Sequence, residues 1–258
     1  MHDLNIACLQ TDIVWQNRDA NLEHLETLVK TIKADCDLIL MPETFNTAFP
    51  VDATLFAEKS DGVTMQWMRC LAEQKKAIVA GSLLLDESDG YHNTFVFMYP
   101  DGTCLSYRKR HTFAIGGETA PIERGEERLV VEVKGWRLMP LVCYDLRFPV
   151  WSRNRFVDGM FAYDALVYVA NFPDSRMSVW DTLLQARAIE NQAYVVAVNR
   201  VGTTPDDTFY SGHSQVIDAR GDRMVLAENG KEQVMLVTLD AEALLSFRKK
   251  FPVAQDWD

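Results

Sequence analysis

Residues 138–149 read LMPLVCYDLRFP, and this stretch is the clearest indication in the chain of an α/β fold. Its first five residues form an apolar run typical of a buried strand, and Pro149 prevents a strand from continuing. The thiol of Cys143 is therefore expected at a strand end, where α/β folds build their sites. A buried cysteine taken alone is more often a small core residue, so the interpretation depends on the rest of the chain.

Two other segments supply charged groups. Residues 38–45 read LILMPETF, an apolar run that ends at a proline and is followed at once by the carboxylate of Glu43. Residues 107–113 read YRKRHTF and follow a turn signal at residues 100–102. Taken singly, Glu43 fits a solvated loop acid and Lys109 fits a surface cation. Together with a later cysteine they form an ordered Glu, Lys and Cys set.

With Glu43, Lys109 and Cys143 in this order, the chain resembles the nitrilase or carbon–nitrogen hydrolase superfamily over nearly its whole length. Within it, residues 140–154 and 188–192 are most similar to bacterial omega-amidases. Those enzymes hydrolyse the terminal amide of 2-oxo acid amides such as 2-oxoglutaramate and 2-oxosuccinamate. The resemblance implies a cysteine-dependent amidohydrolase that forms a thioester and releases ammonia.

The resemblance also implies a role for each residue. Glu43 is the general base, Lys109 the cation that stabilises the oxyanion, and Cys143 the nucleophile. Glu118 falls where many members place a second, supporting glutamate. Val150, where many members have Glu, and Thr112, where Leu is frequent, depart from the family pattern without touching the reactive groups.

The chemistry needs such groups, because a free thiol with a pKa of about 8.5 is only a few per cent thiolate at neutral pH. A carboxylate that accepts its proton contributes roughly 10²- to 10⁴-fold. One preorganised donor to the tetrahedral oxyanion contributes about 3 to 4 kcal/mol. We expect Lys109 and the backbone N–H of Tyr144 to form that oxyanion hole.

Further residues are expected at the substrate. Arg147 and Arg176 are the candidates to bind its carboxylate, although arginine forks suit structural ion pairs equally well. The remaining candidates are three aromatic side chains that could form apolar walls and an asparagine at a strand exit, although aromatics at strand ends are more often core. These residues are Phe113, Phe148, Phe172 and Asn171.

The fold class is α/β, because strand-like runs alternate with helical ones. Strands this apolar need cover on both faces, which favours two facing sheets with helices outside. The resemblance implies a four-layer αββα sandwich of the nitrilase type, a single domain over residues 1–258 and a homodimer. The expected strands are 4–10, 36–41, 77–85, 93–99, 129–133, 136–142, 165–170, 194–199, 214–217 and 234–239, and the expected helices are 21–33, 64–75 and 179–192.

Composition restricts the partners. The chain has 26 basic and 37 acidic residues, a formal net charge of −11 that argues against nucleic-acid binding. A small anionic amide substrate would therefore need a local cationic pocket. Apolar runs such as residues 165–170 fall short of the roughly 20 residues that a bilayer requires, so no membrane partner is expected.

The cysteines and the first residues indicate the compartment. Five cysteines without a CxxC pair indicate neither a disulfide framework nor a zinc site, so we expect no metal and no cofactor. Residues 4–9 look like an opening strand rather than an export signal, and we expect a cytoplasmic protein.

Three alternatives stay open from the sequence. Cys143 could pair with His111 or His213, as in papain-like proteases, although the usual signature around such a nucleophile is missing. Within the superfamily, the substrate could be a larger amide such as deaminated glutathione, or a nitrile. From a different class, the chain could be a non-catalytic nitrilase-like binding scaffold.

Overall fold

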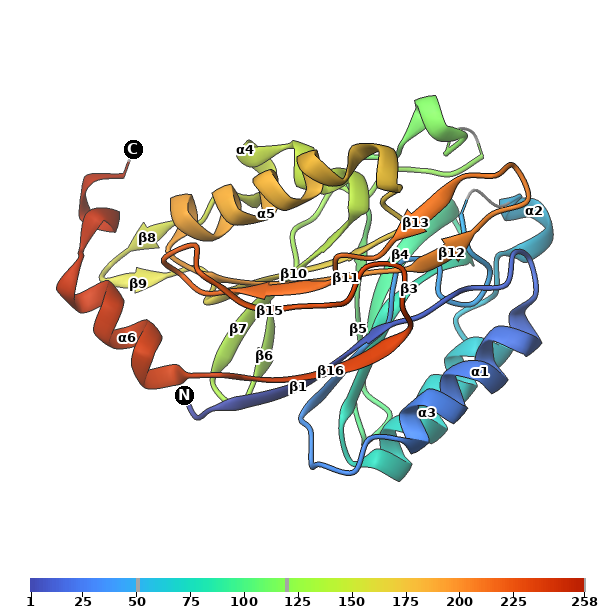
Figure 1. Cartoon of the computed structure of the whole chain (residues 1–258), viewed down its shortest axis with the longest axis horizontal. Helices are drawn as coiled ribbons and strands as arrows, with labels where there is room; N and C mark the ends of the chain where they lie inside the picture. Colours follow the sequence, from blue (N-terminus) through green and yellow to red (C-terminus); the bar gives the residue numbers. More distant parts are fainter. Residues whose placement is uncertain (50–51, 119–120, 258) are drawn as a thin grey trace.

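The computed structural model describes residues 1–49, 52–118 and 121–257, and two six-stranded sheets facing each other form its centre (Figure 1). In spatial order, the first sheet consists of β16 (Gln233–Leu239), β1 (Leu4–Gln10), β2 (Leu38–Leu40), β3 (Ile78–Glu87), β4 (Gly90–Met98) and β5 (Cys104–Arg108). The second consists of β15 (Arg223–Leu226), β14 (Gln215–Ile217), β11 (Tyr194–Asn199), β10 (Ala165–Ala170), β7 (Trp136–Val142) and β6 (Val131–Val133).

Helices cover the outer faces of both sheets. The first sheet is covered by α1 (Arg18–Lys30) and α3 (Val63–Lys75), and the second by α5 (Met177–Asn191) (Figure 1). Apolar side chains from the inner faces of both sheets form one hydrophobic core. The αββα sandwich expected from the sequence is therefore confirmed.

The central strands of each sheet run parallel. In the second sheet, β10 pairs in parallel with both β7 and β11, and in the first sheet β2 pairs in parallel with β1 and β3. Every residue of β10 and β11 is buried, as expected for parallel strands covered on both faces. Parallel strands end at one edge of a sheet, so the residues that follow β7 and β10 are brought together.

Pro140 lies inside β7, where a proline removes one ladder donor. Strand β6 pairs with β7 from Trp136 to Leu138, and Pro140 lies beyond that paired stretch. The strand predicted over 136–142 is confirmed with its proline inside it.

The first helix begins earlier than predicted. The expected range was 21–33, whereas α1 covers Arg18–Lys30 because the Asn17 side chain caps it by accepting from the Ala20 N–H at 3.2 Å. Thr31 forms its C-cap. Leu22, Leu25 and Val29 still give it the predicted buried face.

Several short elements were not predicted. They have weak periodicity or few residues, and tertiary contacts rather than propensity stabilise them. They comprise the helices α2 (Ala53–Phe56), α4 (Pro149–Ser152) and α6 (Ala241–Lys250), the strand β15, the hairpins β8–β9 (Phe156–Val157, Met160–Phe161) and β12–β13 (Val201–Thr203, Phe209–Ser211), and the 3₁₀ turns η1 (Ala114–Gly116), η2 (Cys143–Arg147), η3 (Asp174–Arg176) and η4 (Val253–Asp256).

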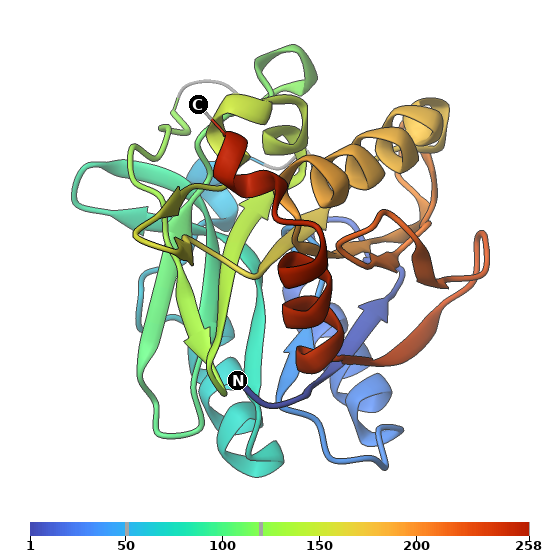
Figure 2. The ribbon, with the colours of Figure 1, turned by 90° about the vertical axis from the view of Figure 1, so that its left-hand side faces the viewer.

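The C-terminal part of the chain returns to the N-terminal strand. Strand β16 pairs antiparallel with β1 along its whole length, and α6 follows it, with the chain then passing back toward the second sheet (Figure 2). Asp240 caps α6 by accepting from the Ala243 N–H at 2.8 Å.

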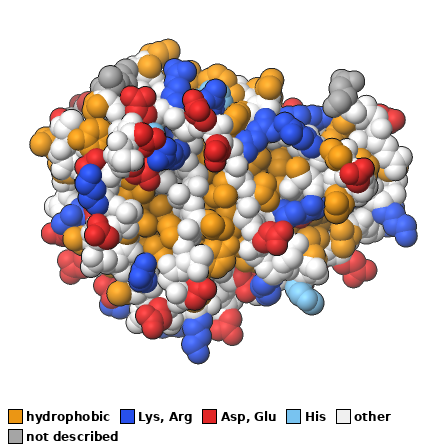
Figure 3. Space-filling model, turned by 180° about the vertical axis from the view of Figure 1, so that it is seen from behind, with side chains coloured by type: hydrophobic (Ala, Val, Ile, Leu, Met, Phe, Trp, Pro, Cys, Tyr) orange, Lys and Arg blue, Asp and Glu red, His pale blue; other side chains and the backbone are white. Residues whose placement is uncertain are grey.

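Charges of both signs are interspersed on the face that Figure 3 shows. Lys and Arg lie beside Asp and Glu around an apolar centre, so the negative net charge does not make this face uniformly acidic. Within the described residues, no helix is long and apolar enough to cross a bilayer.

Candidate active site

The site forms where strand ends of the two sheets meet. Glu43 follows β2 of the first sheet, Cys143 follows β7 of the second, and Asn171 follows β10. The Asn171 backbone N–H donates to Glu43 Oε2 at 2.8 Å, and its side-chain amide donates to the Glu43 carbonyl oxygen at 2.7 Å. These bonds fix the glutamate of one sheet against the strand exit of the other.

Cys143 adopts a left-handed backbone conformation with φ +43°. Such a conformation is uncommon for a side chain other than glycine, and it marks strained turns at functional sites. The thiol is half-buried, and its sulfur lies 3.8 Å from the Asn171 carbonyl oxygen. The sharp turn lifts the sulfur out of the strand, as the strand-end position of the cysteine predicted.

Asp145 holds this turn together. It is fully buried and accepts from the backbone N–H groups of Val142 at 3.0 Å and of His111 at 2.9 Å. The Tyr107 hydroxyl also donates to it at 2.8 Å. Because Tyr107 and His111 flank Lys109 in the chain, Asp145 ties the cysteine turn to the segment that carries the lysine.

Four buried side chains form a closed ring, which we call the carboxylate cluster: Glu43, Asn93, Lys109 and Glu118. Lys109 Nζ donates to Glu43 Oε1 at 2.8 Å and to Glu118 Oε2 at 2.7 Å. The Asn93 amide donates to Oε1 of both glutamates at 2.9 Å. Each of the four side chains is about 1% exposed.

The cluster sets the protonation of its members. Burial lowers the pKa of the Lys109 ammonium, but the charges of Glu118 and Glu43 more than offset this and the net pKa is raised. Burial raises the pKa of the Cys143 thiol, and the Glu43 charge raises it further, while Lys109 opposes the shift. The resting pair is therefore a neutral thiol beside a cationic lysine.

A cavity of about 180 Å³ opens beside Cys143. Its size suits a small molecule, below the range of roughly 300 to 1,000 Å³ that drug-sized ligands occupy. It is lined by Glu43, Phe49, Lys109, Phe113, Gly116, Cys143, Tyr144, Arg147, Asn171, Phe172, Pro173, Arg176, Asp206, Thr208 and Tyr210.

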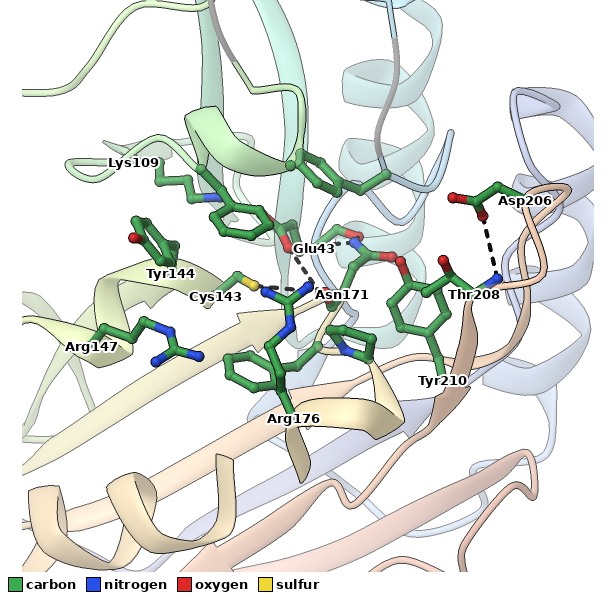
Figure 4. Close-up of a pocket in the computed structure, with 15 residues that line it drawn as sticks. Glu43, Lys109, Cys143, Tyr144, Arg147, Asn171, Arg176, Asp206, Thr208 and Tyr210 are labelled. Carbon is green, nitrogen blue, oxygen red and sulfur yellow. Dashed lines mark hydrogen bonds and ion pairs between the residues drawn. The ribbon is translucent and has the colours of Figure 1, made fainter. Parts of the chain in front are cut away.

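The two predicted arginines reach this cavity. Arg147 lies with its guanidinium carbon 5.9 Å from the Phe172 ring centre, and that of Arg176 lies 5.0 Å from the Phe113 ring centre. In the described part of the chain, neither guanidinium forms an ion pair with an acid. Figure 4 shows both groups directed toward the region of Cys143.

One predicted pocket wall lies elsewhere. Phe148 is not among the residues that line the cavity; its ring stacks on His111 with centroids 3.7 Å apart. The short 3₁₀ turn after Cys143 directs Phe148 toward His111, and the strand-end position gave no indication of that rotation. Glu118 does not line the cavity either; it accepts a hydrogen bond from Lys109, which does.

Sequence reasoning missed several residues of the site. Asn93 interrupts the apolar strand β4, and a polar residue in a buried run is a signal that could have been followed. Phe49, Asp206, Thr208 and Tyr210 come from loops and a hairpin whose path the sequence pattern does not determine.

Neither histidine considered as a partner for Cys143 lines the cavity. His111 Nδ1 lies 2.7 Å from Asp145, and His213 Nδ1 lies 3.1 Å from Asp181. The geometry therefore does not support a Cys–His pair.

Among the described residues, one group has metal-ligand composition: Glu87, Asp89 and His92. Arg108 contacts Glu87 and donates two hydrogen bonds to Asp89, at 2.7 and 3.1 Å. This arginine already neutralises the carboxylates, so the group fits an ion-pair network better than a metal site.

Comparison with known proteins identifies the family. The model of the carbon-nitrogen hydrolase family matches residues 5–249. The chain belongs to the carbon–nitrogen hydrolase family. This confirms the resemblance inferred from Glu43, Lys109 and Cys143.

Two curated proteins illustrate how close other members of the family are. Omega-amidase YafV of Yersinia enterocolitica is 43% identical over 258 residues, which cover 100% of this chain and 98% of that protein. The 2-oxoglutaramate amidase of Bacillus subtilis is 32% identical, over 97% of this chain and 96% of that protein.

A solved structure of the carbon–nitrogen hydrolase superfamily is similar along the whole chain. The protein XC1258 of Xanthomonas campestris, whose structure carries an arsenic adduct in the active site, has a TM-score of 0.97 and 42% identity. The alignment covers 100% of this chain and 98% of that one. The architecture of this chain is therefore that of the superfamily.

Proposed function

We propose that the protein is an omega-amidase, which hydrolyses the terminal amide of 2-oxo acid amides such as 2-oxoglutaramate and 2-oxosuccinamate to the 2-oxo dicarboxylate and ammonia. One observation carries the proposal: two arginines that form no ion pair with a described acid line the same small cavity as Glu43, Lys109 and Cys143. The similarity to proteins named omega-amidase and 2-oxoglutaramate amidase supports it.

Attack begins with a neutral thiol. The pKa of the Cys143 thiol is raised, so the thiol keeps its proton until the Glu43 carboxylate accepts it as sulfur bonds to the amide carbon. The Lys109 and Asn93 donors occupy Glu43 Oε1, which keeps the carboxylate in a single orientation. Glu43 then acts as the general base.

Negative charge next develops on the former carbonyl oxygen. Lys109 lines the cavity and keeps its proton, because its pKa is raised, so it can stabilise that oxyanion together with the backbone N–H of Tyr144. Glu118 holds the ammonium in place from the side away from the cavity. Glu118 thus acts as a positioning residue.

The intermediate collapses when the carbon–nitrogen bond breaks and Glu43 returns the proton to the leaving nitrogen. Ammonia departs and a thioester remains on Cys143. Glu43 then takes a proton from water, whose oxygen bonds to the acyl carbon, and the released thiolate regains a proton. No step requires a metal or an organic cofactor.

The arginine side of the cavity selects the acyl group. A carboxylate of the substrate would form bidentate hydrogen bonds with Arg147 or Arg176, whose guanidinium groups have no described acidic partner. Phe113 and Phe172 close the apolar walls, and Asn171 completes the floor. A cavity of about 180 Å³ favours a short dicarboxylate chain over deaminated glutathione.

A substrate panel tests the proposal. Ammonia release is measured with 2-oxoglutaramate, 2-oxosuccinamate, deaminated glutathione and a simple nitrile. We expect the two short 2-oxo amides to have the highest kcat/KM. Preference for deaminated glutathione would assign the alternative substrate, and no release from either short amide would refute the omega-amidase proposal.

Iodoacetamide labelling tests the competing binding scaffold. A scaffold's Cys143 should be labelled no faster than an ordinary thiol, whereas a cysteine activated by Glu43 should be labelled selectively. Cys70 is exposed and provides the ordinary thiol for comparison in the same chain. Equal labelling of the two cysteines would favour the scaffold.

We further propose that residues 1–258 act as one domain, that the protein is a cytoplasmic homodimer and that its substrate is a small anionic amide. Outward apolar side chains on α4 and α5 support association, because Val150 is 81% and Ile189 52% exposed. Light scattering after size exclusion should give twice the chain mass of 29.4 kDa. A monomer at micromolar concentration would contradict the dimer.

A further inference from the structure

The cavity has a cationic side and an anionic side. Arg147 lies on the side of Cys143 away from Tyr210, Arg176 lies next to Cys143, and Asp206, Thr208 and Tyr210 lie together on the other side (Figure 4). The Asp206 pKa is lowered, chiefly because the Thr204 hydroxyl donates to it at 2.6 Å, so this side stays anionic at neutral pH. An anionic acyl chain is attracted to the first side and repelled from the second.

Tyr210 presents a neutral hydroxyl close to the reacting groups. Burial raises the pKa of its phenol to about 12, and the charges of Cys143 and Glu43 contribute to the shift. The residue is 4% exposed, and in the described part of the structure no hydrogen bond to its hydroxyl is formed. An unpaired phenol beside a reaction centre is free to bind a group of the substrate.

The surrounding chain holds Tyr210 rigidly. Strand β13 pairs it with Gly202 of β12, and the guanidinium of the fully buried Arg200 lies 4.8 Å from its ring centre. Arg200 is itself fixed by hydrogen bonds to Asp12 at 2.7 Å and to the Ile13 carbonyl at 3.0 Å. The hydroxyl is therefore preorganised, as specificity-determining groups are.

We propose that Tyr210, with Thr208 and Asp206, forms the subsite for the leaving nitrogen of the amide. The Tyr210 oxygen accepts an N–H of the bound amide, which orients the nitrogen to receive the proton from Glu43. Ammonia then leaves past Thr208 and Asp206. Once water has protonated the ammonia, the negative charge of Asp206 attracts the ammonium ion. This subsite rests on the proposed amidase function and adds the group that distinguishes amides from esters.

The test compares an amide with an ester of the same acid. Tyr210→Phe removes the hydroxyl and keeps the ring over Arg200. We expect kcat/KM for the monoamide of glutaric acid to fall about tenfold, because one hydrogen bond is lost, while that for its monomethyl ester stays within about threefold. Tyr194→Phe, which removes a buried hydroxyl outside the cavity, is the matched control.

A second readout does not depend on acylation by an amide. With the ester as substrate and hydroxylamine present, the acyl-enzyme partitions between acid and hydroxamate, and the amine enters through the leaving-nitrogen subsite. We expect Tyr210→Phe to lower the hydroxamate-to-acid ratio severalfold. Thr208→Val should shift it in the same direction, which keeps the test available if Tyr210→Phe does not fold.

Equal losses on amide and ester, or no loss on either, would overturn the subsite. A loss that follows the 2-oxo group instead, seen by comparing 2-oxoglutaramate with the glutaric monoamide, would assign the hydroxyl to the acyl chain and also overturn it. If the wild type hydrolyses no amide but does hydrolyse the ester, the amidase proposal fails, and the hydroxylamine partition still decides the subsite.

Discussion

The carboxylate cluster and the arginine side of the cavity are built in opposite ways. In the cluster, Lys109 is 1% exposed and donates to two carboxylates at 2.7 and 2.8 Å. On the arginine side of the cavity, Arg147 and Arg176 are half-buried, lie against aromatic rings and form no ion pair with a described acid. A hydrogen-bond donor that is fixed before the substrate binds, such as Lys109, can act on any amide. Guanidinium groups without an acidic partner favour only substrates that carry a carboxylate.

Among variants of the carboxylate cluster, Glu43→Gln should cause the largest loss of activity. We expect kcat/KM to fall about 10²- to 10⁴-fold, because the general base is lost. Glu43 is also the acceptor of the Cys143 proton, so the selective labelling of Cys143 by iodoacetamide should be lost in this variant. Steady-state kinetics and mass spectrometry measure the two effects.

The matched control is Glu58→Gln, which alters a buried carboxylate that does not line the cavity. It should leave both turnover and labelling near the wild-type values. Full turnover of Glu43→Gln would show that another group takes the thiol proton.

Lys109→Met should reduce both activity and stability. Loss of an oxyanion donor should lower kcat about 10²- to 10³-fold. Two buried carboxylates are left without their cation, which should reduce the free energy of unfolding by about 3 to 5 kcal/mol at neutral pH. The two carboxylate charges repel each other once the cation between them is gone, so the deficit should shrink as the pH falls and one of the charges is neutralised.

Urea unfolding at several pH values measures the loss in free energy of unfolding. Lys75→Met is the control, because the Lys75 ammonium donates to the carbonyl oxygen of Val29, at 2.9 Å, rather than to a carboxylate. A deficit that does not change with pH would contradict the account of the cluster.

Arg147→Gln and Arg176→Gln test the arginine side of the cavity. We expect KM for an anionic omega-amide to rise about 10- to 100-fold in the variant that loses the carboxylate contact, with kcat changed less. A neutral amide of the same length should be unaffected. Arg220→Gln, an exposed arginine paired with Asp218, is the control. An unchanged KM in both arginine variants would place the substrate carboxylate elsewhere.

Phe148→Leu and Phe172→Leu form the pair with the smallest expected effects. Phe172 lines the cavity, so its variant should change KM severalfold. Phe148 packs on His111, so its variant should leave KM within about twofold and lower the free energy of unfolding by about 1 to 2 kcal/mol. Kinetics and thermal unfolding separate the two, and a shift of KM in Phe148→Leu alone would reverse the assignment.

The sequence predicted the parts of the site that lie on strands. Cys143 and Asn171 follow strands with long apolar runs, whose ends can be located from periodicity, and Glu43 follows a proline that ends a third run. The layers followed from the same runs together with the family resemblance. Predicted ranges 4–10, 136–142, 165–170 and 194–199 match the observed strands residue for residue.

The parts that the sequence did not predict depend on tertiary contacts. The β12–β13 hairpin places Tyr210 in the cavity because Arg200 and Asp12 fix its base, and these residues are 188 positions apart. Phe148 is turned away by a stack with His111 that depends on Asp145. Asn93 could be recognised as an unusual polar residue, but its two carboxylate partners could not.

Trapping the acyl-enzyme tests the central claim most directly. The protein is mixed with 2-oxoglutaramate, quenched in acid within the first turnover and digested for mass spectrometry. We expect one acyl group on Cys143, with ammonia released in a burst ahead of the dicarboxylate, and neither in Cys143→Ala. Undiminished hydrolysis by Cys143→Ala, or an acyl group on another residue, would contradict the account.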